Sequence, residues 1–212
     1  LKAVKNDVQQ DGFRRAHERD AVAMVRLLRR VEQMTAAGEP LTEMDVAAMA
    51  AALRAEVAPG LYNQESFALI AGYNEHGAIV HYEATPETDA ASSAPGLLLI
   101  DTGGQYLDGT TDVTRTIALG EPSPEQRHDY TLVLKGHLAL QAAQFPEGTT
   151  GVQLDVLARQ FLWREGLTYG HGTGHGVGHF LGCHEGPQSI RTNLNPVPLQ
   201  AGMVVSDEPG LY

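Results

Sequence analysis

Hydrophobic positions divide the chain into two successive sets of helices and strands. From Asp11 to Met34, apolar residues recur at helical spacing among charged ones, which predicts an amphipathic helix. Gly38-Glu39-Pro40 breaks this pattern, and Thr42 is the expected N-cap of a second, alanine-rich helix that stops near Pro59-Gly60. Shorter apolar runs then predict strands over residues 67–71, 78–82 and 97–100.

A second helix pair and a final strand follow. Ser123 and Thr150 each begin a capping-box pattern, so we expect helices from there to about Phe145 and to about Gly166. Residues 202–207 predict a last strand. Segregated helices and hairpin-connected strands indicate an α+β fold, and the repeated order of helix pair and strands indicates two related halves.

The strand over residues 97–100 ends on an acid, Asp101, and a second acid, Asp112, follows it. A buried carboxylate needs hydrogen-bond donors or a cation, and both Arg115 and a metal are candidates. Asp108-Gly109 is a hairpin signal. A two-residue turn there would leave Asp101 opposite Thr116, away from the second acid, so we expect a wider loop.

Composition narrows the class of protein. The 212 residues are 42% hydrophobic and 19% charged, which is typical of a globular protein. The formal net charge of -11 argues against a nucleic-acid or anionic-membrane partner, and no run predicts a membrane span or a secretory leader. The single cysteine, Cys183, excludes an intrachain disulfide and favours a reducing, cytoplasmic setting. The chain starts at Leu1 and stops at Tyr212, just after a motif, so we expect it to be a piece of a longer protein.

Histidines and acids supply the candidate chemistry. Four of the nine histidines lie between His171 and His184, in a segment too rich in glycine for a helix. Taken alone, this segment is equally well explained as a polar glycine loop without a ligand. Two aspartates, one histidine and one glutamate at expected strand ends form an oxygen-rich set that suits Mn²⁺, Mg²⁺, Zn²⁺ or Co²⁺: Asp101, Asp112, His175 and Glu208. Two such ions bridged by carboxylates would activate water for hydrolysis.

Three motifs in order carry a resemblance to a known family. The stretches DGTTDVTRT, HGTGHGVGHFLGCHEGP and DEPGLY resemble the signature of metallo-aminopeptidases of the creatinase/prolidase superfamily, and within it most of all Xaa-Pro aminopeptidases (aminopeptidase P). The resemblance implies the α+β pita-bread fold. It further implies that residues 1–212 form one catalytic domain that lacks the family's N-terminal domains and its last strands.

The resemblance implies which residues bind the two metal ions. Asp101 resembles the terminal ligand of one ion, Asp112 the bridging aspartate, and His175 the sole nitrogen ligand. Glu208 resembles a ligand of the other ion that also takes the proton of the attacking water. The family's fifth ligand, a bridging glutamate, would lie beyond Tyr212. A polypeptide that truly ended there is therefore expected to be inactive and low in metal.

Other histidines resemble the family's active-site residues that bind no metal. His184 and His81 are expected to hold the scissile carbonyl and the oxyanion, and His171 to shape the pocket for proline. Glu185 and Arg115 are expected to support the site, with Arg115 orienting the acids.

The implied function is removal of an N-terminal residue that precedes proline, by a water shared between two divalent ions. The expected metal is Mn²⁺, with Co²⁺ or Zn²⁺ as alternatives. The expected substrates are peptides with proline in the second position. The full-length protein is a candidate homodimer. A prolidase, acting on dipeptides, is the nearest alternative. A binding module without metal is a third reading, and it is disfavoured because all four ligand positions in range are retained.

Overall fold

The helices and strands fall into two compact units. The computed structural model describes residues 2–180 and 182–212. One unit is Asp11–Pro122, and the other combines Ser123–Tyr212 with the first ten residues of the chain. Each unit contains a helix pair and short antiparallel strands, as the order of the elements predicted. The grouping of both into a single catalytic domain stays a prediction, and motif residue Leu181 lies outside the described residues.

The first two helices lie close to their predicted positions. Helix α1 (Asp7–Ala37) runs a few residues beyond both predicted ends, and α2 (Glu43–Val57) begins after Thr42. The Asp45 amide donates to Thr42 Oγ1 at 3.2 Å, and Asp45 Oδ2 accepts from the Thr42 amide at 3.0 Å. This reciprocal capping box satisfies two amides that the helix itself cannot pair, which confirms the predicted start.

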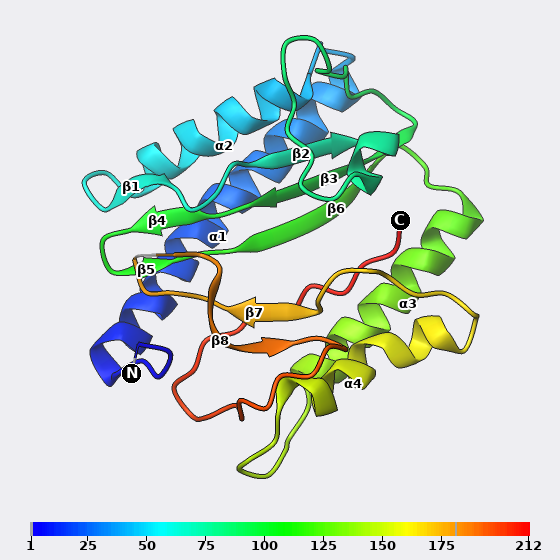
Figure 1. Cartoon of the computed structure of the whole chain (residues 1–212). Coiled ribbons are helices and arrows are strands. Elements are labelled where there is room, and N and C mark those ends of the chain that lie inside the picture. Colours follow the sequence, from blue (N-terminus) through cyan, green and yellow to red (C-terminus); the bar gives the residue numbers. More distant parts are fainter. Residues whose placement is uncertain (1, 181) are drawn as a thin grey trace. The chain divides into compact units, whose positions relative to one another are not determined.

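Two antiparallel sheets follow in the unit Asp11–Pro122. The first has the order β2 (Ile70–Tyr73), β3 (Gly96–Thr102), β6 (Val113–Leu119), and the second has the order β1 (Tyr62–Glu65), β4 (Gly104–Tyr106), β5 (Gly109–Thr110). Helices α1 and α2 cover one face of the first sheet (Figure 1). Their shared core is formed by Met24, Leu27, Val31, Leu41, Val46, Ala50, Ala71, Leu98, Ile100 and Leu119.

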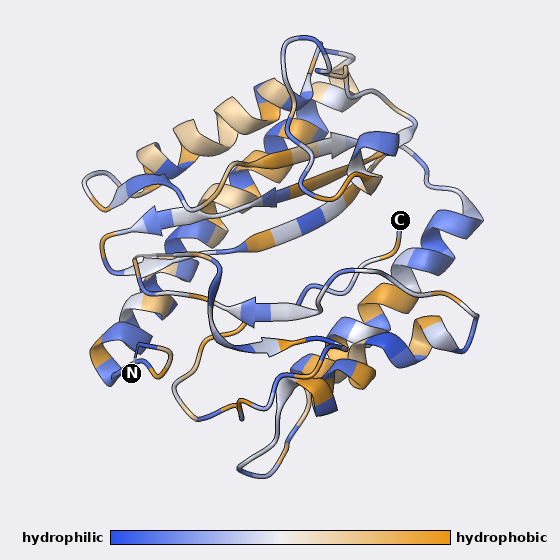
Figure 2. Cartoon of the chain, viewed as in Figure 1, coloured by the Kyte–Doolittle hydropathy of each residue, from blue (hydrophilic) through white to orange (hydrophobic). Residues whose placement is uncertain are grey.

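Burial alternates along β3 and sets the direction of Asp101. Leu98, Ile100 and Thr102 are fully buried, whereas Leu99 and Asp101 between them are only half-buried. Side chains of a strand alternate between the two faces of its sheet, so Asp101 lies on the face opposite the helix-covered core. In Figure 2 the body of β3 is orange and its arrowhead is blue, so the strand changes from hydrophobic to hydrophilic at its end.

The hairpin between the two acids has a different register from the predicted one. Asp101 pairs with Thr114, and the ladder closes on the two-residue turn Leu107-Asp108. The predicted turn at Asp108-Gly109 and the wide loop are therefore wrong. Asp112 is two residues from the partner of Asp101, so the two acids are diagonal neighbours, with backbone positions roughly 7–8 Å apart across the strand pair. No widened loop is required to bring them near one another.

Contacts with α1 fix this register. Asp108 Oδ1 and Oδ2 accept from the Arg19 guanidinium at 2.8 and 2.9 Å, and this hydrogen bonding lowers the pKa of the Asp108 carboxyl. A Cβ on Gly109 would lie 3.1 Å from both Phe13 Cα and Ala16 Cβ, so the glycine is needed for close approach to the helix. Tertiary packing thus overrides the local Asp-Gly turn signal.

The predicted strand over residues 78–82 is wrong. A short 3₁₀ helix, η1 (Asn74–Ala78), and a turn occupy this segment, and Ile79 and Val80 are exposed. The strand predicted over residues 67–71 is confirmed only at its end, since β2 begins at Ile70. His81 is exposed and has a φ of 58°, a left-handed conformation that few residues other than glycine adopt.

A buried carboxylate replaces the strand hydrogen bonds of this segment. Glu43 is fully buried in the first turn of α2. Its Oε1 accepts from the Tyr73 amide at 2.7 Å and contacts His76 Nδ1 at 2.9 Å, and its Oε2 accepts from the Tyr82 hydroxyl at 2.8 Å and the Ala90 amide at 3.0 Å. These donors span the segment that carries His81, so one side chain ties the segment to α2.

Replacing Glu43 with glutamine is expected to loosen residues 73–90. An amide accepts hydrogen bonds at one end only, so buried donors lose their acceptor at a cost of about 1–3 kcal/mol. Hydrogen–deuterium exchange should speed up in peptides from this segment. Glu87→Gln, an exposed acid in the same segment, is the matched control. Unchanged exchange in the Glu43 variant would show that other contacts hold the segment.

The second unit begins with the other predicted helix pair. Helix α3 (Pro124–Gln141) starts with the Ser123–Gln126 capping box and ends before the expected Phe145, and α4 (Gly151–Trp163) follows Thr150. The strands are β7 (Gly174–Gly176) and β8 (Glu185–Ile190), which pair antiparallel. Leu140, Leu154, Ala158, Ile190 and Leu199 form the core. None of the helices in the described part is long and apolar enough to span a membrane.

The last predicted strand is present as an extended segment beside β7. The Val177 amide donates to the Val204 carbonyl at 3.0 Å, the Ser206 amide to the His175 carbonyl at 2.9 Å, and the Glu208 amide to the Thr173 carbonyl at 2.8 Å. These bonds share one antiparallel register, although only isolated bridges form within the segment. The pairing places Glu208 beside the glycine-rich segment.

Candidate metal site

His175 and Glu208 meet in the unit that contains β7. His175 lies in the middle of β7, and its Nε2 is 3.1 Å from Glu208 Oε1. Its Nδ1 is 2.9 Å from the Gly176 carbonyl. A carbonyl oxygen can only accept, so Nδ1 carries a proton and donates it, and Nε2 is directed at the carboxylate.

Ser206 holds both His175 and Glu208 in place. Its Oγ donates to Glu208 Oε1 at 2.5 Å and accepts from the His175 amide at 2.9 Å. The glycine at position 174 has a steric cause, since a Cβ on Gly174 would collide with the Ser206 carbonyl. Glycine therefore allows the extended segment that carries Glu208 to approach β7 closely.

Two further histidines of the motif lie in the same unit. The exposed His184 stands edge-on to His175, with ring centroids 4.5 Å apart. His171 Nε2 is 3.0 Å from the Tyr212 hydroxyl. The His171 ring also packs against the Tyr169 ring, with ring centroids 4.8 Å apart. The structure thus brings His184 next to the candidate ligand and places His171 among aromatic rings.

The other candidate ligands lie in the unit Asp11–Pro122. Asp101 Oδ1 accepts from Thr114 Oγ1 at 2.6 Å across the β3–β6 pair, and Asp112 precedes β6. Arg115 donates to the Thr114 carbonyl at 2.6 Å, so the expected partnership of Arg115 with the acids is replaced by a backbone contact. His81 also belongs to this unit. The seven candidate residues therefore divide between the units: Asp101, Asp112 and His81 in one, and His171, His175, His184 and Glu208 in the other.

Two supporting contacts were not apparent in the sequence. His137 Nδ1, on α3, lies 3.0 Å from Oδ2 of Asp207, the residue before Glu208. Burial raises the pKa of Asp207 to about 6, although the nearby His137 lowers it. Glu185, expected to support the site, pairs with the buried Lys5 at 3.2 Å. Both contacts join residues far apart in the chain, which no local pattern reveals.

The residues present fit a divalent cation. With Nδ1 protonated, His175 Nε2 and Glu208 Oε1 direct lone pairs at each other over 3.1 Å, an arrangement that needs a proton or a metal between them. Two ligands that are each about 2.0–2.2 Å from one ion lie roughly 3 Å apart, as these atoms do. The Nδ1 contact with a backbone carbonyl also fixes the ring as it is fixed in metal-bound histidines.

An α+β fold with a histidine and a carboxylate held 3.1 Å apart, as ligands of one cation are, indicates a metal-dependent hydrolase. The model of metallopeptidase family M24 matches residues 11–212, and the chain belongs to that family. This confirms the predicted family and its pita-bread fold.

Known proteins of this family are similar over the whole chain. A probable Xaa-Pro aminopeptidase P of Laccaria bicolor is 48% identical over all of this chain and 33% of its own length. The X-prolyl aminopeptidase of Caenorhabditis elegans, described as a cytosolic enzyme with a di-nuclear active site, superposes with a TM-score of 0.95 at 41% identity, over all of this chain and 34% of that one. The prolidase of Pyrococcus furiosus superposes with a TM-score of 0.87 at 29% identity, over all of this chain and 58% of that one. The chain thus spans about a third of the length of the Laccaria bicolor protein.

Proposed function

We propose that the full-length protein is a dinuclear-metal Xaa-Pro aminopeptidase. The observation that carries this proposal is the 48% identity to a probable Xaa-Pro aminopeptidase P across the whole chain. All four ligand residues expected from the motifs are present, at Asp101, Asp112, His175 and Glu208. We propose Mn²⁺ as the metal and, by analogy with the cytosolic relative, the cytoplasm as the location. The homodimer stays a prediction.

The bound ions would supply a water made nucleophilic at neutral pH and an electrophile for the scissile carbonyl. Glu208 takes the proton of the attacking water and passes it to the departing proline nitrogen. His184 and His81 donate hydrogen bonds to the carbonyl oxygen as negative charge develops on it. His171 offers a ring face to the proline side of the substrate, and its contacts with Tyr169 and Tyr212 hold that ring.

A substrate panel tests this function. The full-length protein loaded with Mn²⁺ is expected to cleave Xaa-Pro tripeptides and longer peptides faster than matched Xaa-Ala peptides. Equal rates on both would contradict specificity for proline. Activity confined to Xaa-Pro dipeptides would favour a prolidase, the second candidate, which the superposition on the Pyrococcus furiosus prolidase supports. Absence of both hydrolysis and metal would favour a binding module.

Replacing His184 with alanine is expected to lower kcat by about 10²–10³-fold with a smaller change in KM. A donor to the developing oxyanion acts mainly in the transition state, so its loss appears in kcat. Steady-state kinetics on an Xaa-Pro tripeptide measure both constants. His128→Ala, an exposed histidine on α3 whose partner is Glu165, is the control. An effect on KM alone would assign His184 to substrate binding instead.

A further inference from the structure

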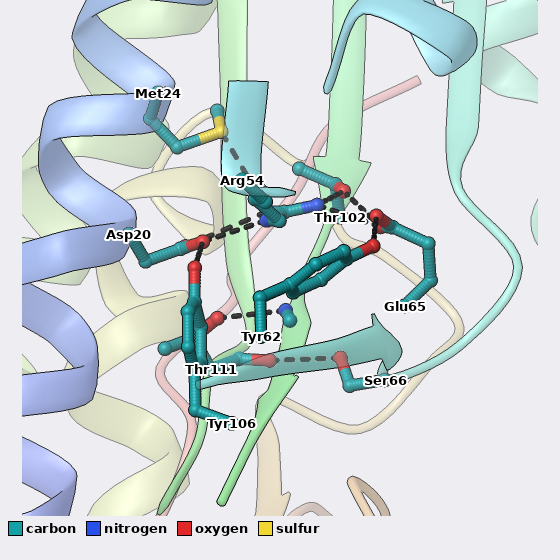
Figure 3. Close-up of polar contacts among 10 residues, drawn as sticks. Asp20, Met24, Arg54, Tyr62, Glu65, Ser66, Thr102, Tyr106 and Thr111 are labelled. Atoms are coloured by element: carbon teal, nitrogen blue, oxygen red, sulfur yellow. Dashed lines mark hydrogen bonds and ion pairs between the residues drawn. The ribbon is translucent and has the colours of Figure 1, made fainter. Parts of the chain in front are cut away.

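Arg54 is the centre of a buried charge cluster in the unit Asp11–Pro122 (Figure 3). Its side chain is 1% exposed. Nε donates to Asp20 Oδ1 at 2.6 Å, and Nη1 donates at 2.6 Å to both Glu65 Oε2 and Thr102 Oγ1. The guanidinium therefore links α1, β1 and the end of β3 to its own helix, α2.

Two tyrosines complete the cluster. The Tyr106 hydroxyl donates to Asp20 Oδ1 at 2.9 Å, and the Tyr62 hydroxyl donates to Glu65 Oε1 at 2.5 Å. Burial, followed by the neighbouring carboxylates, raises the pKa of both tyrosines, so both hydroxyls keep the protons that they donate. Both carboxylates are thus held by the guanidinium and by a tyrosine.

Stability alone does not account for a buried ion cluster, because apolar residues of similar volume often serve as well or better. The cluster does, however, fix two fully buried threonines, Thr102 and Thr111. Thr102 Oγ1 accepts from Arg54 and donates to Glu65 Oε2 at 3.2 Å. The Thr111 carbonyl accepts from Ser66 Oγ at 2.9 Å, and Ser66 directly follows Glu65 (Figure 3).

These threonines are the chain neighbours of the two candidate metal ligands in this unit. Thr102 follows Asp101, and Thr111 precedes Asp112. Since neighbouring side chains of a strand face opposite ways, holding Thr102 on the buried face fixes Asp101 on the other. The Thr111 backbone, held by Ser66, fixes the start of the segment that carries Asp112.

We propose that Arg54 is a positioning residue for metal binding. Arg54 holds Asp101 in place through Thr102, and it holds Asp112 in place through Glu65 and Ser66. Both carboxylates are thereby oriented before a metal ion binds. This inference rests on the proposed dinuclear function. Residues that orient ligands in this way typically change metal affinity by about 10–100-fold when they are replaced.

The test is Mn²⁺ affinity in the full-length protein, measured by titration calorimetry on metal-free samples. Arg54→Ala would leave the buried Asp20 and the half-buried Glu65 without their cation and is expected to unfold the unit. The gentler variant is Thr102→Val, which removes the hydroxyl and keeps the shape. We expect Mn²⁺ to bind this variant about 10–100-fold more weakly. Ser66→Ala, on the Asp112 side, is expected to weaken binding in the same direction.

Two controls separate positioning from folding. Thr102→Ser keeps the hydroxyl and is expected to restore wild-type affinity. Arg26→Gln breaks an exposed ion pair with Glu56 between the same two helices and is expected to leave affinity unchanged. Wild-type affinity in Thr102→Val, or equal weakening in Thr102→Ser, would overturn the positioning role alone. Failure of the wild-type protein to bind Mn²⁺ would overturn the proposed function and this inference with it.

Discussion

Replacing Asp112 with asparagine in the full-length protein is expected to abolish peptide hydrolysis and to reduce bound metal. A bridging carboxylate offsets the charge of both ions, and a neutral amide cannot. Loss of several kcal/mol of transition-state stabilisation corresponds to a fall in kcat of roughly 10³-fold or more. Turnover on an Xaa-Pro tripeptide and metal content by mass spectrometry measure the two effects together.

The matched control is the same substitution at the tip of the same hairpin. Asp108 pairs with Arg19 and Arg15 of α1, and no role in metal binding is proposed for it. The amide oxygen of Asp108→Asn can still accept from Arg19, so the hairpin register should hold. This variant should therefore keep its metal and its turnover, with a stability loss of about 0.2–1 kcal/mol from the weakened ion pairs. If Asp112→Asn retained full metal content and near-normal turnover, the bridging role would be wrong.

Replacing Glu208 with glutamine is expected to have the second-largest effect. The amide oxygen still accepts from Ser206 Oγ, so the segment should stay in place, but it cannot take a proton from water. Loss of a general base typically lowers kcat by about 10²–10⁴-fold. Steady-state kinetics with saturating Mn²⁺ separate this effect from weaker metal binding.

A second histidine–glutamate contact in the same unit provides the control for Glu208. His128 Nε2 lies 3.2 Å from Glu165 Oε2, and both side chains are about half exposed. Glu165→Gln should leave kcat within about twofold, since a surface pair of this kind contributes little. If Glu208→Gln behaved like Glu165→Gln, the proton acceptor would be another group.

Local signals were sufficient to predict the helices. Each predicted start at Thr42, Ser123 and Thr150 is a real helix start. A full capping box satisfies two amides at Thr42 and at Ser123, and the Gln153 side chain accepts from the Thr150 amide. The central strand was predicted equally well, since Leu98 and Ile100 of its apolar run are buried under α1 and α2. The order of the three motifs was sufficient to indicate the family.

Contacts between distant residues account for what could not be predicted. The hairpin register depends on Asp108 reaching Arg19, and the loss of a strand over residues 78–82 depends on Glu43. Arg54 and Asp20 are 34 residues apart, and the helical pattern gave no reason to place their side chains inside. In each case a buried polar group selects the local conformation, and an apolar pattern carries no information about such groups.

Crystallography of the full-length protein with Mn²⁺, using anomalous scattering, shows whether two ions bind at the proposed site. We expect two anomalous peaks about 3.5–4 Å apart. They should lie within coordination distance of Asp101, Asp112, His175 Nε2 and Glu208, with Asp112 between the two ions. Absence of any peak at these four residues, in a sample shown to contain Mn²⁺, would contradict the proposed metal site.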